Sequence, residues 1–334
     1  MIPTATRNRV HVLALGGTIA MTSPGDGHGV RPALDARALV ASAPEISAVA
    51  EVGFDAFRPV PGAHLRLSDM QAVAARIDDL LDGGVNGVVV VQGTDTLEET
   101  AFALDLLCGS DRPIVVTGAM RNPTMPGADG PANLLGAVRV AASSTASGLG
   151  TLVAMNDEIH AARFVRKGHT SRPSAFGCAG VGPIGWIAEE RVRIPLRVGH
   201  RVRVVPLPGA QPPPVALVSV ALGDDGRVLD RLVDLGYAGV VLAAFGAGHL
   251  PERMVDAAAR LADAMPVVLT SRTGAGEGLR GTYDFPGSEI DLLSKGLLSG
   301  GALDPYKMRV LLSLALSAGW DPGRIADAIE QLSG

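Results

Sequence analysis

Residues 87–107 read GVVVVQGTDTLEETAFALDLL, and this stretch decides the fold. Gly87–Val91 is an uninterrupted apolar run of strand length, which is typical of a strand that is buried on both faces. Leu97–Leu107 then has the composition of a helix, and Glu98 and Glu99 suit the positive end of its dipole. A buried strand followed by a helix is the repeating unit of a parallel α/β sheet.

The same alternation continues on both sides of this stretch. The predicted strands are short and apolar throughout: His11–Leu15, Gly87–Val91, Ile114–Thr117, Thr151–Ala154, Val215–Ala221, Val240–Ala244 and Val267–Thr270. The predicted helices are Ser68–Leu81, Leu97–Leu107, Ala132–Ala142, Val228–Leu235, Met254–Ala264, Lys307–Ala318 and Arg324–Gln331. Apolar strands between helices indicate parallel sheets covered on both faces, so we predict a doubly wound α/β fold.

Prolines divide the chain into two parts. Residues 204–214 contain Pro206, Pro208 and the run Pro212–Pro214. Proline removes backbone donors and disfavours helix before it, so we predict a stiff linker at 204–214. Residues 1–203 would then form a larger N-terminal catalytic α/β domain, and residues 215–334 a smaller C-terminal α/β domain. A length of 334 residues agrees with two domains.

Composition and charge exclude several classes of protein. Hydrophobic residues make up 47% of the chain and charged residues 19%, which is a globular composition. Acidic residues outnumber basic ones by 34 to 29, which argues against a nucleic-acid-binding face. The basic stretch Arg191–Arg203 alternates with apolar residues, so it predicts a half-buried edge strand rather than a phosphate-binding patch.

The sequence also predicts where the protein works. Met1–Val10 lacks the apolar segment of a signal peptide, and no apolar run approaches the ~18 residues of a membrane helix. Two cysteines, Cys108 and Cys178, rule out a disulfide scaffold. We expect free thiols in a reducing cytosol, with a single bridge between the two as the alternative. We therefore expect a cytoplasmic protein that binds neither a membrane nor nucleic acid.

Polar groups gather where the predicted strands of the first domain end. Ligands bind beyond the carboxyl ends of parallel strands, so these groups are candidates for a site. They are Thr18 behind Gly16-Gly17, Thr94 and Asp95 behind Gly87–Val91, the backbone N–H groups of Gly118–Arg121, and Lys167 in the loop after Met155–Asp157.

Each candidate also has an ordinary structural interpretation. A Gly-Gly-Thr turn alone is more often a tight turn or a nucleotide-binding turn. Thr94 and Asp95 could cap the helix that begins near Leu97, and Lys167 alone would be a solvated surface lysine. The seven histidines lack metal-ligand spacing, and no Walker loop or G-x-S-x-G elbow appears, so we predict neither metal nor cofactor.

Taken together, these stretches resemble the bacterial-type L-asparaginase family, which includes the asparaginase-glutaminases. Two motifs carry most of the likeness, LGGTIA at 15–20 and GTDTLEET at 93–100. Further support comes from Val116–Arg121, Ala128–Leu134, Met155–Asp157, Leu303–Pro305, Lys307 and Arg309–Leu312. The likeness covers nearly the whole chain and implies the family's two-domain α/β fold.

The resemblance implies a metal-free amidohydrolase that releases L-aspartate and ammonia from L-asparagine, with glutaminase activity on the side. It implies Thr18 as the nucleophile, faced across the substrate by Thr94, Lys167 and Asp95. A threonine hydroxyl needs a base to attack at neutral pH, and a desolvated lysine can serve as that base.

The resemblance further implies which residues bind the substrate. The backbone N–H of Ala119 would stabilise an oxyanion. Asp95 would hold the α-amino group, joined by a carboxylate at the position of Glu289 from a neighbouring subunit; without the family, Glu289 would be an ordinary surface acid. The residues that the resemblance implies to bind the substrate are Asp95, Ser68, Gly93, Ala119, His249 and Glu289. The implied assembly is a homotetramer, a dimer of two intimate dimers.

Three positions depart from the family pattern. The loop Met21–Arg31 has no tyrosine, Leu67 stands where the family has a serine that holds the substrate carboxylate, and Gly248-His249 replaces a glycine-asparagine pair. His249 would replace the lost contact or widen specificity. The first two departures support an alternative function, a catalytically weak amino-acid sensor on the same fold.

Two further expectations concern a second alternative function and the segment after Thr18. An ammonia-supplying amidotransferase subunit is a second alternative, which we disfavour because no extra module precedes the first strand. The glycine-bearing segment Ser23–Val30 is expected to be a mobile lid over Thr18.

Overall fold

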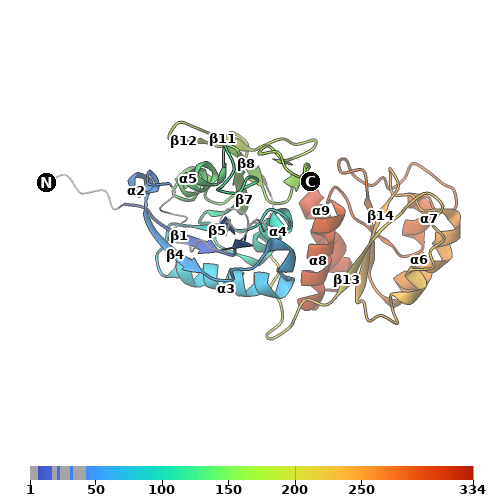
Figure 1. Cartoon of the computed structure of the whole chain (residues 1–334). Helices are drawn as coiled ribbons and strands as arrows, with labels where there is room; N and C mark the ends of the chain where they lie inside the picture. Colours follow the sequence, from blue (N-terminus) through green and yellow to red (C-terminus); the bar gives the residue numbers. More distant parts are fainter. Residues whose placement is uncertain (1–6, 17–20, 23–30, 33–42, 200, 334) are drawn as a thin grey trace. The chain divides into compact units, whose positions relative to one another are not determined.

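The computed structural model describes residues 7–16, 21–22, 31–32, 43–199 and 201–333. The chain forms two compact units, residues 1–199 and 200–334 (Figure 1). Each unit is a sheet flanked by helices, so the predicted two-domain α/β fold is confirmed. Val204 is buried and Leu207 N–H donates to Ser317 O at 3.0 Å within the second unit. The role of 204–214 as a stiff linker stays a prediction.

The first unit is built on an eight-stranded sheet with the order β12-β11-β8-β7-β6-β5-β1-β4. Its strands are β1 (Arg9–Ala14), β4 (Glu51–Ala56), β5 (Gly87–Val91), β6 (Ile114–Thr117), β7 (Thr151–Met155), β8 (Glu158–Ala161), β11 (Gly185–Ala188) and β12 (Arg191–Arg193). The strands from β4 to β7 are parallel, whereas β8, β11 and β12 run antiparallel to their neighbours. The sheet is therefore mixed, and only its parallel half matches the prediction of parallel strands.

Two short antiparallel pairs lie outside this sheet: β2 (Met21–Thr22) with β3 (Arg31–Pro32), and β9 (Arg166–Lys167) with β10 (Phe176–Gly177). The edge strand predicted over Arg191–Arg203 is present only as β12. The basic residues beyond it are not in a strand.

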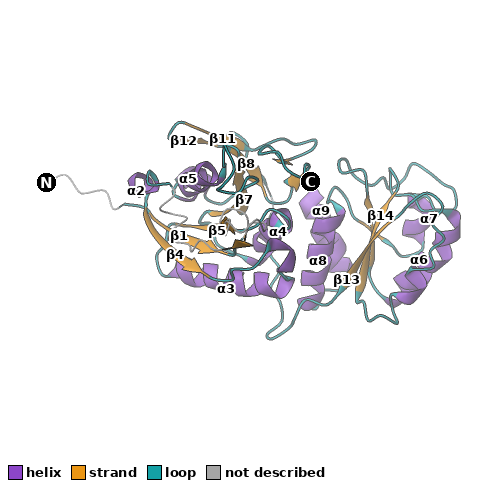
Figure 2. Cartoon of the chain, in the orientation of Figure 1, coloured by secondary structure: helices purple, strands orange, loops and turns teal. Residues whose placement is uncertain are grey.

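Helices cover both faces of the first sheet. They are α2 (Ile46–Val49), α3 (Leu67–Asp82), α4 (Leu97–Leu107) and α5 (Gly130–Ala141), with single 3-10 turns at η2 (Gly62–His64) and η3 (Ser144–Ala146). Figure 2 shows α2 and α5 on one face and α3 on the other. Val89 and Val91 of β5 share a core with α5, while Val88 and Val90 are buried on the opposite face. A fully apolar strand is what two covered faces require.

The second unit has a smaller, parallel sheet with the order β13-β14-β15-β16. Its strands are β13 (Val215–Ser219), β14 (Gly239–Ala244), β15 (Val267–Ser271) and β16 (Leu298–Ser299). The helices are α6 (Val255–Ala264), α7 (Glu289–Ser294), α8 (Pro305–Ser317) and α9 (Pro322–Ser333), with 3-10 turns at η4 (Leu229–Arg231) and η5 (Glu252–Met254). Asp304 caps α8 by accepting from the backbone N–H groups of Tyr306 and Lys307.

One predicted helix is wrong. Over Val228–Leu235 the structure has only the 3-10 turn η4. Gly226 and Gly236 flank this segment with φ angles of +79° and +78°, a left-handed backbone that closes a helix. The short stretch between them is left with tight i→i+3 turns. The other predicted strands and helices are present, with ends within a few residues of the expected ones. Over the described ranges, the helices are too short or too polar to cross a membrane.

Candidate active site

Two glycines allow the segment that precedes α3 to pack against the carboxyl ends of β1 and β5. Gly16 has a φ of +91°, and a Cβ there would lie 2.6 Å from the carbonyl oxygen of Val60. Gly62 lies against the backbone of Gly93, with a Cβ position 3.1 Å from Gly93 O. Side chains at Gly16 would collide with this backbone, so the glycine is required there. The strand ends that carry the two motifs are therefore packed together.

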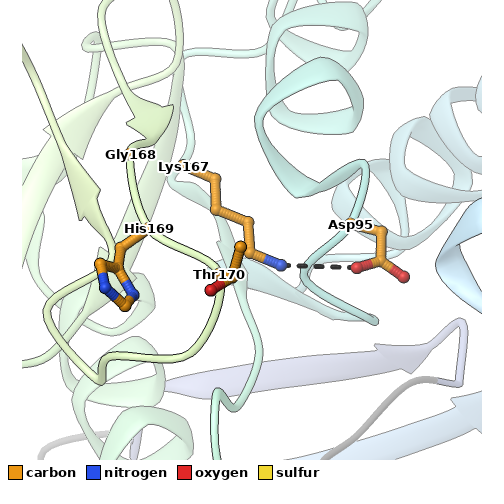
Figure 3. A pocket seen from close by; sticks show the side chains of 5 residues that line it. All are labelled: Asp95, Lys167, Gly168, His169 and Thr170. Atoms are coloured by element: carbon orange, nitrogen blue, oxygen red, sulfur yellow. Dashed lines mark hydrogen bonds and ion pairs between the residues drawn. The ribbon is translucent and has the colours of Figure 1, made fainter.

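Three of the four predicted catalytic residues meet at this edge of the sheet. Lys167 Nζ donates to Thr94 Oγ1 at 2.9 Å and lies 3.4 Å from Asp95 Oδ1 (Figure 3). Thr94 is 6% exposed, the Lys167 side chain 18%, and the Asp95 side chain 65%. An amine is thus held beside a buried hydroxyl, with a carboxylate open to ligands. The fourth residue, Thr18, lies outside the described residues, as does the predicted lid Ser23–Val30.

The capping interpretation of this loop does not hold. The N-cap of α4 is Thr96, not Thr94 or Asp95, and its hydroxyl donates to Gly62 O at 2.9 Å. The Thr94 hydroxyl contacts Lys167 instead. The surface-lysine interpretation fails too, because most of the Lys167 side chain is covered.

A hairpin and a helix together hold Lys167 in place. Lys167 lies on β9, where it pairs with Phe176 of β10, and Gly168 N–H donates to Ala175 O at 2.7 Å. The backbone N–H of Lys167 donates to Oε2 of Glu98 in the first turn of α4. The sequence had suggested only a helix-dipole role for Glu98, because a contact between residues so far apart leaves no local pattern.

Beside this cluster lies a cleft of about 450 Å³, lined by Asp95, Lys167, Gly168, His169 and Thr170. His169 Nδ1 accepts hydrogen bonds from the backbone N–H groups of Ser171 and Arg172 at 3.1 and 3.2 Å. Sequence reasoning did not single out His169 or Thr170.

Two side chains hold the turn after β6: Asp129, the residue before α5, and Asn133 within α5. Asp129 accepts from the N–H groups of Met120 at 3.0 Å and Arg121 at 2.8 Å. Asn133 donates to Gly118 O at 3.0 Å and accepts from Asn156 N–H at 2.9 Å, so it ties the ends of β6 and β7 together.

These hydrogen bonds remove two backbone N–H groups of the turn from the candidates for an oxyanion donor. The N–H groups of Met120 and Arg121 are committed to Asp129. Ala119, which precedes these two residues, is fully buried. The same hydrogen bonds also give the motif at 128–134 a structural purpose, because its aspartate and asparagine fix this turn.

Ser68 lies in the first turn of α3, directly after Leu67, and is partly buried. The neighbouring Asp69 accepts from Arg66 N–H at 2.9 Å and pairs with Arg58 Nε at 3.0 Å. Asp69 therefore fixes the start of the helix. Leu67, which stands where the family has a serine that holds the substrate carboxylate, and Ser68 both lie in this first turn.

The second unit brings His249 and Glu289 together. Glu289 begins α7, and its Oε1 accepts from the N–H groups of Thr282 at 2.8 Å and Tyr283 at 2.7 Å. His249 Nε2 lies 3.1 Å from Glu289 Oε2 and donates to it, because a carboxylate can only accept. The rings of Tyr283 and Phe285 each meet the His249 ring edge-on, with centroids 5.0 Å away.

Glu289 is not the surface acid that its local sequence suggests, since it is 0% exposed. Burial alone would raise its pKa, but the hydrogen bonds from Tyr283, Thr282 and His249 outweigh that, so the pKa lies below its ordinary value. The carboxylate is thus held charged at a fixed position.

Cysteine and histidine also meet away from this site. Cys178 Sγ lies 3.3 Å from Nδ1 of His160, which is fully buried, and burial lowers the pKa of His160 to about 4. Neither Cys178 nor Cys108 is in a disulfide. In the part of the chain that the structure describes, no group of three or more His, Cys, Asp or Glu side chains is arranged to hold a metal.

Comparison with known proteins covers both units. Residues 9–198 match the family model "Asparaginase, N-terminal", and residues 214–329 match "Glutaminase/Asparaginase C-terminal domain". An L-asparaginase of Bacillus licheniformis is 34% identical over 93% of this chain and 96% of its own length. A glutaminase-asparaginase of Acinetobacter glutaminasificans is 32% identical over 93% and 96%. The crystal structure of a probable cytoplasmic L-asparaginase from Campylobacter jejuni matches with a TM-score of 0.88 and 31% identity, over 97% of this chain and 99% of that one.

Proposed function

The chain belongs to the asparaginase family, and on that premise we propose that it hydrolyses the side-chain amide of L-asparagine to L-aspartate and ammonia. The observation that carries the proposal is the contact of Lys167 Nζ with Thr94 Oγ1, with the Asp95 carboxylate beside it. An amine and a hydroxyl in contact at the mouth of a cleft can move a proton to or from a bound amide. The names of the relatives point to the same reaction.

In the mechanism that we propose, Thr18 is the nucleophile. Its hydroxyl oxygen bonds to the amide carbon, the C–N bond breaks, and ammonia leaves with the proton that the hydroxyl gave up. Water then attacks the resulting ester, which releases aspartate and restores the threonine hydroxyl. The pair of Lys167 and Thr94 is the group in the cleft best suited to pass protons in both steps, since its heavy atoms are already 2.9 Å apart.

Charge on the carbonyl oxygen needs a donor as each tetrahedral intermediate forms. The backbone N–H of Ala119 is our candidate, because Asp129 occupies the next two N–H groups of the same turn. A donor fixed by its neighbours needs little reorganisation when the charge develops. Gly93 and Ser68 are proposed to contribute the backbone and hydroxyl contacts that orient the substrate.

The substrate's α-amino group requires a carboxylate. Asp95 is suited to this because its side chain is 65% exposed beside the cleft. We further propose that the protein acts in the cytoplasm as a homo-oligomer, a dimer of intimate dimers, in which Glu289 and His249 of one copy serve the site of another. The buried, charged state of Glu289 supports a recognition role, because a carboxylate held this way has little freedom to shift.

Glutamine is proposed as a secondary substrate. One extra methylene in a pocket changes discrimination by only ~1–3 kcal/mol, so the residue types lining this cleft do not exclude it. One of the relatives is named for both activities.

The direct test is ammonia release from L-asparagine and L-glutamine by the purified chain. We expect L-asparagine to be hydrolysed with one aspartate formed for each ammonia. The Lys167→Met protein should remain folded and release almost none. Binding of L-asparagine without ammonia release would contradict hydrolysis and favour the amino-acid sensor.

A further inference from the structure

Lys167 is attached to the loop of Thr94 and Asp95 at two points. Its side-chain amine reaches Thr94 Oγ1, and its backbone N–H donates to Glu98 Oε2, 69 residues earlier in the chain. Thr94, Asp95 and Glu98 lie within five residues of one another, at the start of α4. One short segment therefore holds both ends of the lysine.

The second attachment matters because of where Lys167 lies. Its strand, β9, is two residues long and pairs with β10 in a separate two-stranded sheet, not in the eight-stranded sheet that carries Thr94. The tie to α4 therefore joins Lys167 directly to the segment that carries Thr94, which the pairing of the hairpin does not do. Ordering a lysine side chain costs conformational entropy, and a fixed backbone at its base reduces the number of conformations that are lost when Nζ meets Thr94.

We propose that Glu98 is a positioning residue for amide hydrolysis, whose carboxylate holds the backbone of Lys167 so that Nζ meets Thr94. The proposal rests on the proposed function above. A displacement of ~1 Å in a catalytic group can lower a rate by about 100-fold, so a carboxylate that never touches substrate can still govern turnover.

The ordinary alternative is that Glu98 only stabilises α4 through the helix dipole. Glu99 provides the matched control, because it carries the same charge in the same turn. A dipole role predicts equal effects for the two residues. A positioning role predicts an effect for Glu98 alone.

The experiment compares Glu98→Ala, Glu98→Gln and Glu99→Ala by ammonia release and thermal unfolding. We expect Glu98→Ala to lose about 10- to 100-fold in kcat with little change in KM. Glu98→Gln should recover most of that loss, since its amide oxygen can still accept from Lys167 N–H. Glu99→Ala should turn over like the wild type, and both alanine variants should unfold at similar temperatures. Equal losses in the two alanine variants would overturn the proposal.

Hydrogen exchange at the Lys167 amide gives a readout that does not depend on the reaction. Its exchange should be faster in Glu98→Ala than in the wild type and unchanged in Glu99→Ala. If the wild type hydrolysed no amide, the proposed function would fail while this measurement still decided the contact. Exchange that is the same in Glu98→Ala and the wild type would show that Glu98 does not hold Lys167.

Discussion

Both sheets of this chain present polar side chains beyond the carboxyl ends of their strands, but the two sets differ in kind. In the first unit, Lys167 Nζ meets the Thr94 hydroxyl, and the Asp95 side chain is 65% exposed. In the second unit, Glu289 is 0% exposed, and three donors from its own chain fix its carboxylate. The first set holds groups that can exchange protons, whereas the second holds a charge that stays in one place.

We propose that this difference divides reaction from recognition. Thr94, Asp95 and Lys167 lie at what we call the reaction edge, and Glu289 and His249 at what we call the recognition edge. A hydroxyl and an amine in contact are of use where bonds are made and broken. A buried carboxylate with a lowered pKa and aromatic neighbours is suited to a cationic group such as an amino acid's ammonium. Two units of the same fold class therefore differ in the chemistry that they offer.

The largest effect should come from the hydroxyls of the reaction edge. Thr18→Val and Thr94→Val keep the side-chain volume but remove the hydroxyl, so each should lower kcat by ~10³-fold or more in a folded protein. Ammonia release and circular dichroism measure this. If either variant kept most of its activity with unaltered KM, that threonine would have to leave the proposed mechanism.

A variant of the recognition edge should give a smaller effect of a different type. Glu289→Gln removes the charge but keeps the shape, and the loss of a charged hydrogen bond to substrate, ~1.5–3 kcal/mol, should raise KM for L-asparagine by about 10- to 100-fold. The kcat should change much less. Asp291→Asn, in the same helix, controls for local damage because its carboxylate accepts from Gly287 N–H and pairs with Lys295. A fall in kcat alone would break the proposed division.

The two units should also lose stability at different pH values. Burial lowers the pKa of His160 from 6.5 to about 4, so between these values the unfolded chain binds the proton more readily than the folded one. The contribution of His160 to the free energy of unfolding of the first unit is therefore fully present above pH 6.5. It is lost as the pH falls towards 4. The expected loss from pH 7 to pH 5 is about 2 kcal/mol.

Glu289 also loses its contribution to stability as the pH falls, but in a lower pH range. Its pKa is lowered from an ordinary value of 4.5, so its contribution is present above that value and is lost only as the pH falls through the lower, folded-state pKa. Urea unfolding at pH 7 and pH 5, followed by Trp186 fluorescence in a Trp320→Phe background, isolates the first unit. His160→Gln should abolish the pH 5 loss; the same loss in this variant would rule out His160 as its cause.

Local pattern was enough to predict the elements that carry the first site. β5 and α4 begin and end at the predicted residues, because an unbroken apolar run and the polar residues 92–96 mark their ends. The antiparallel strands β8 and β11 were not predicted, since each has only four residues, whereas β12 is the first part of the edge strand that was predicted over Arg191–Arg203. A sheet edge depends on its neighbours more than on its own sequence.

The contacts of the site were harder to predict than its members. Thr94, Asp95 and Lys167 could be chosen from strand ends and family likeness, and the structure brings them together. The bond from Lys167 to Glu98 joins residues far apart in sequence and leaves no periodic signal. Burial of Glu289 was missed for a different reason. Its backbone donors lie only six and seven residues earlier, but a loop conformation that turns two N–H groups toward one carboxylate has no residue pattern.

The central claim is that the reaction edge of one copy and the recognition edge of another form a single site. Thr18→Ala and Glu289→Ala proteins, each nearly inactive, can be unfolded, mixed in equal amounts and refolded together. Random pairing in a two-fold dimer makes about half of the dimers mixed, and each mixed dimer has one site free of both substitutions. The account predicts that ammonia release from L-asparagine recovers to about a quarter of the wild-type value. No recovery above that of the separate variants would contradict it, because every site would then be built within one chain.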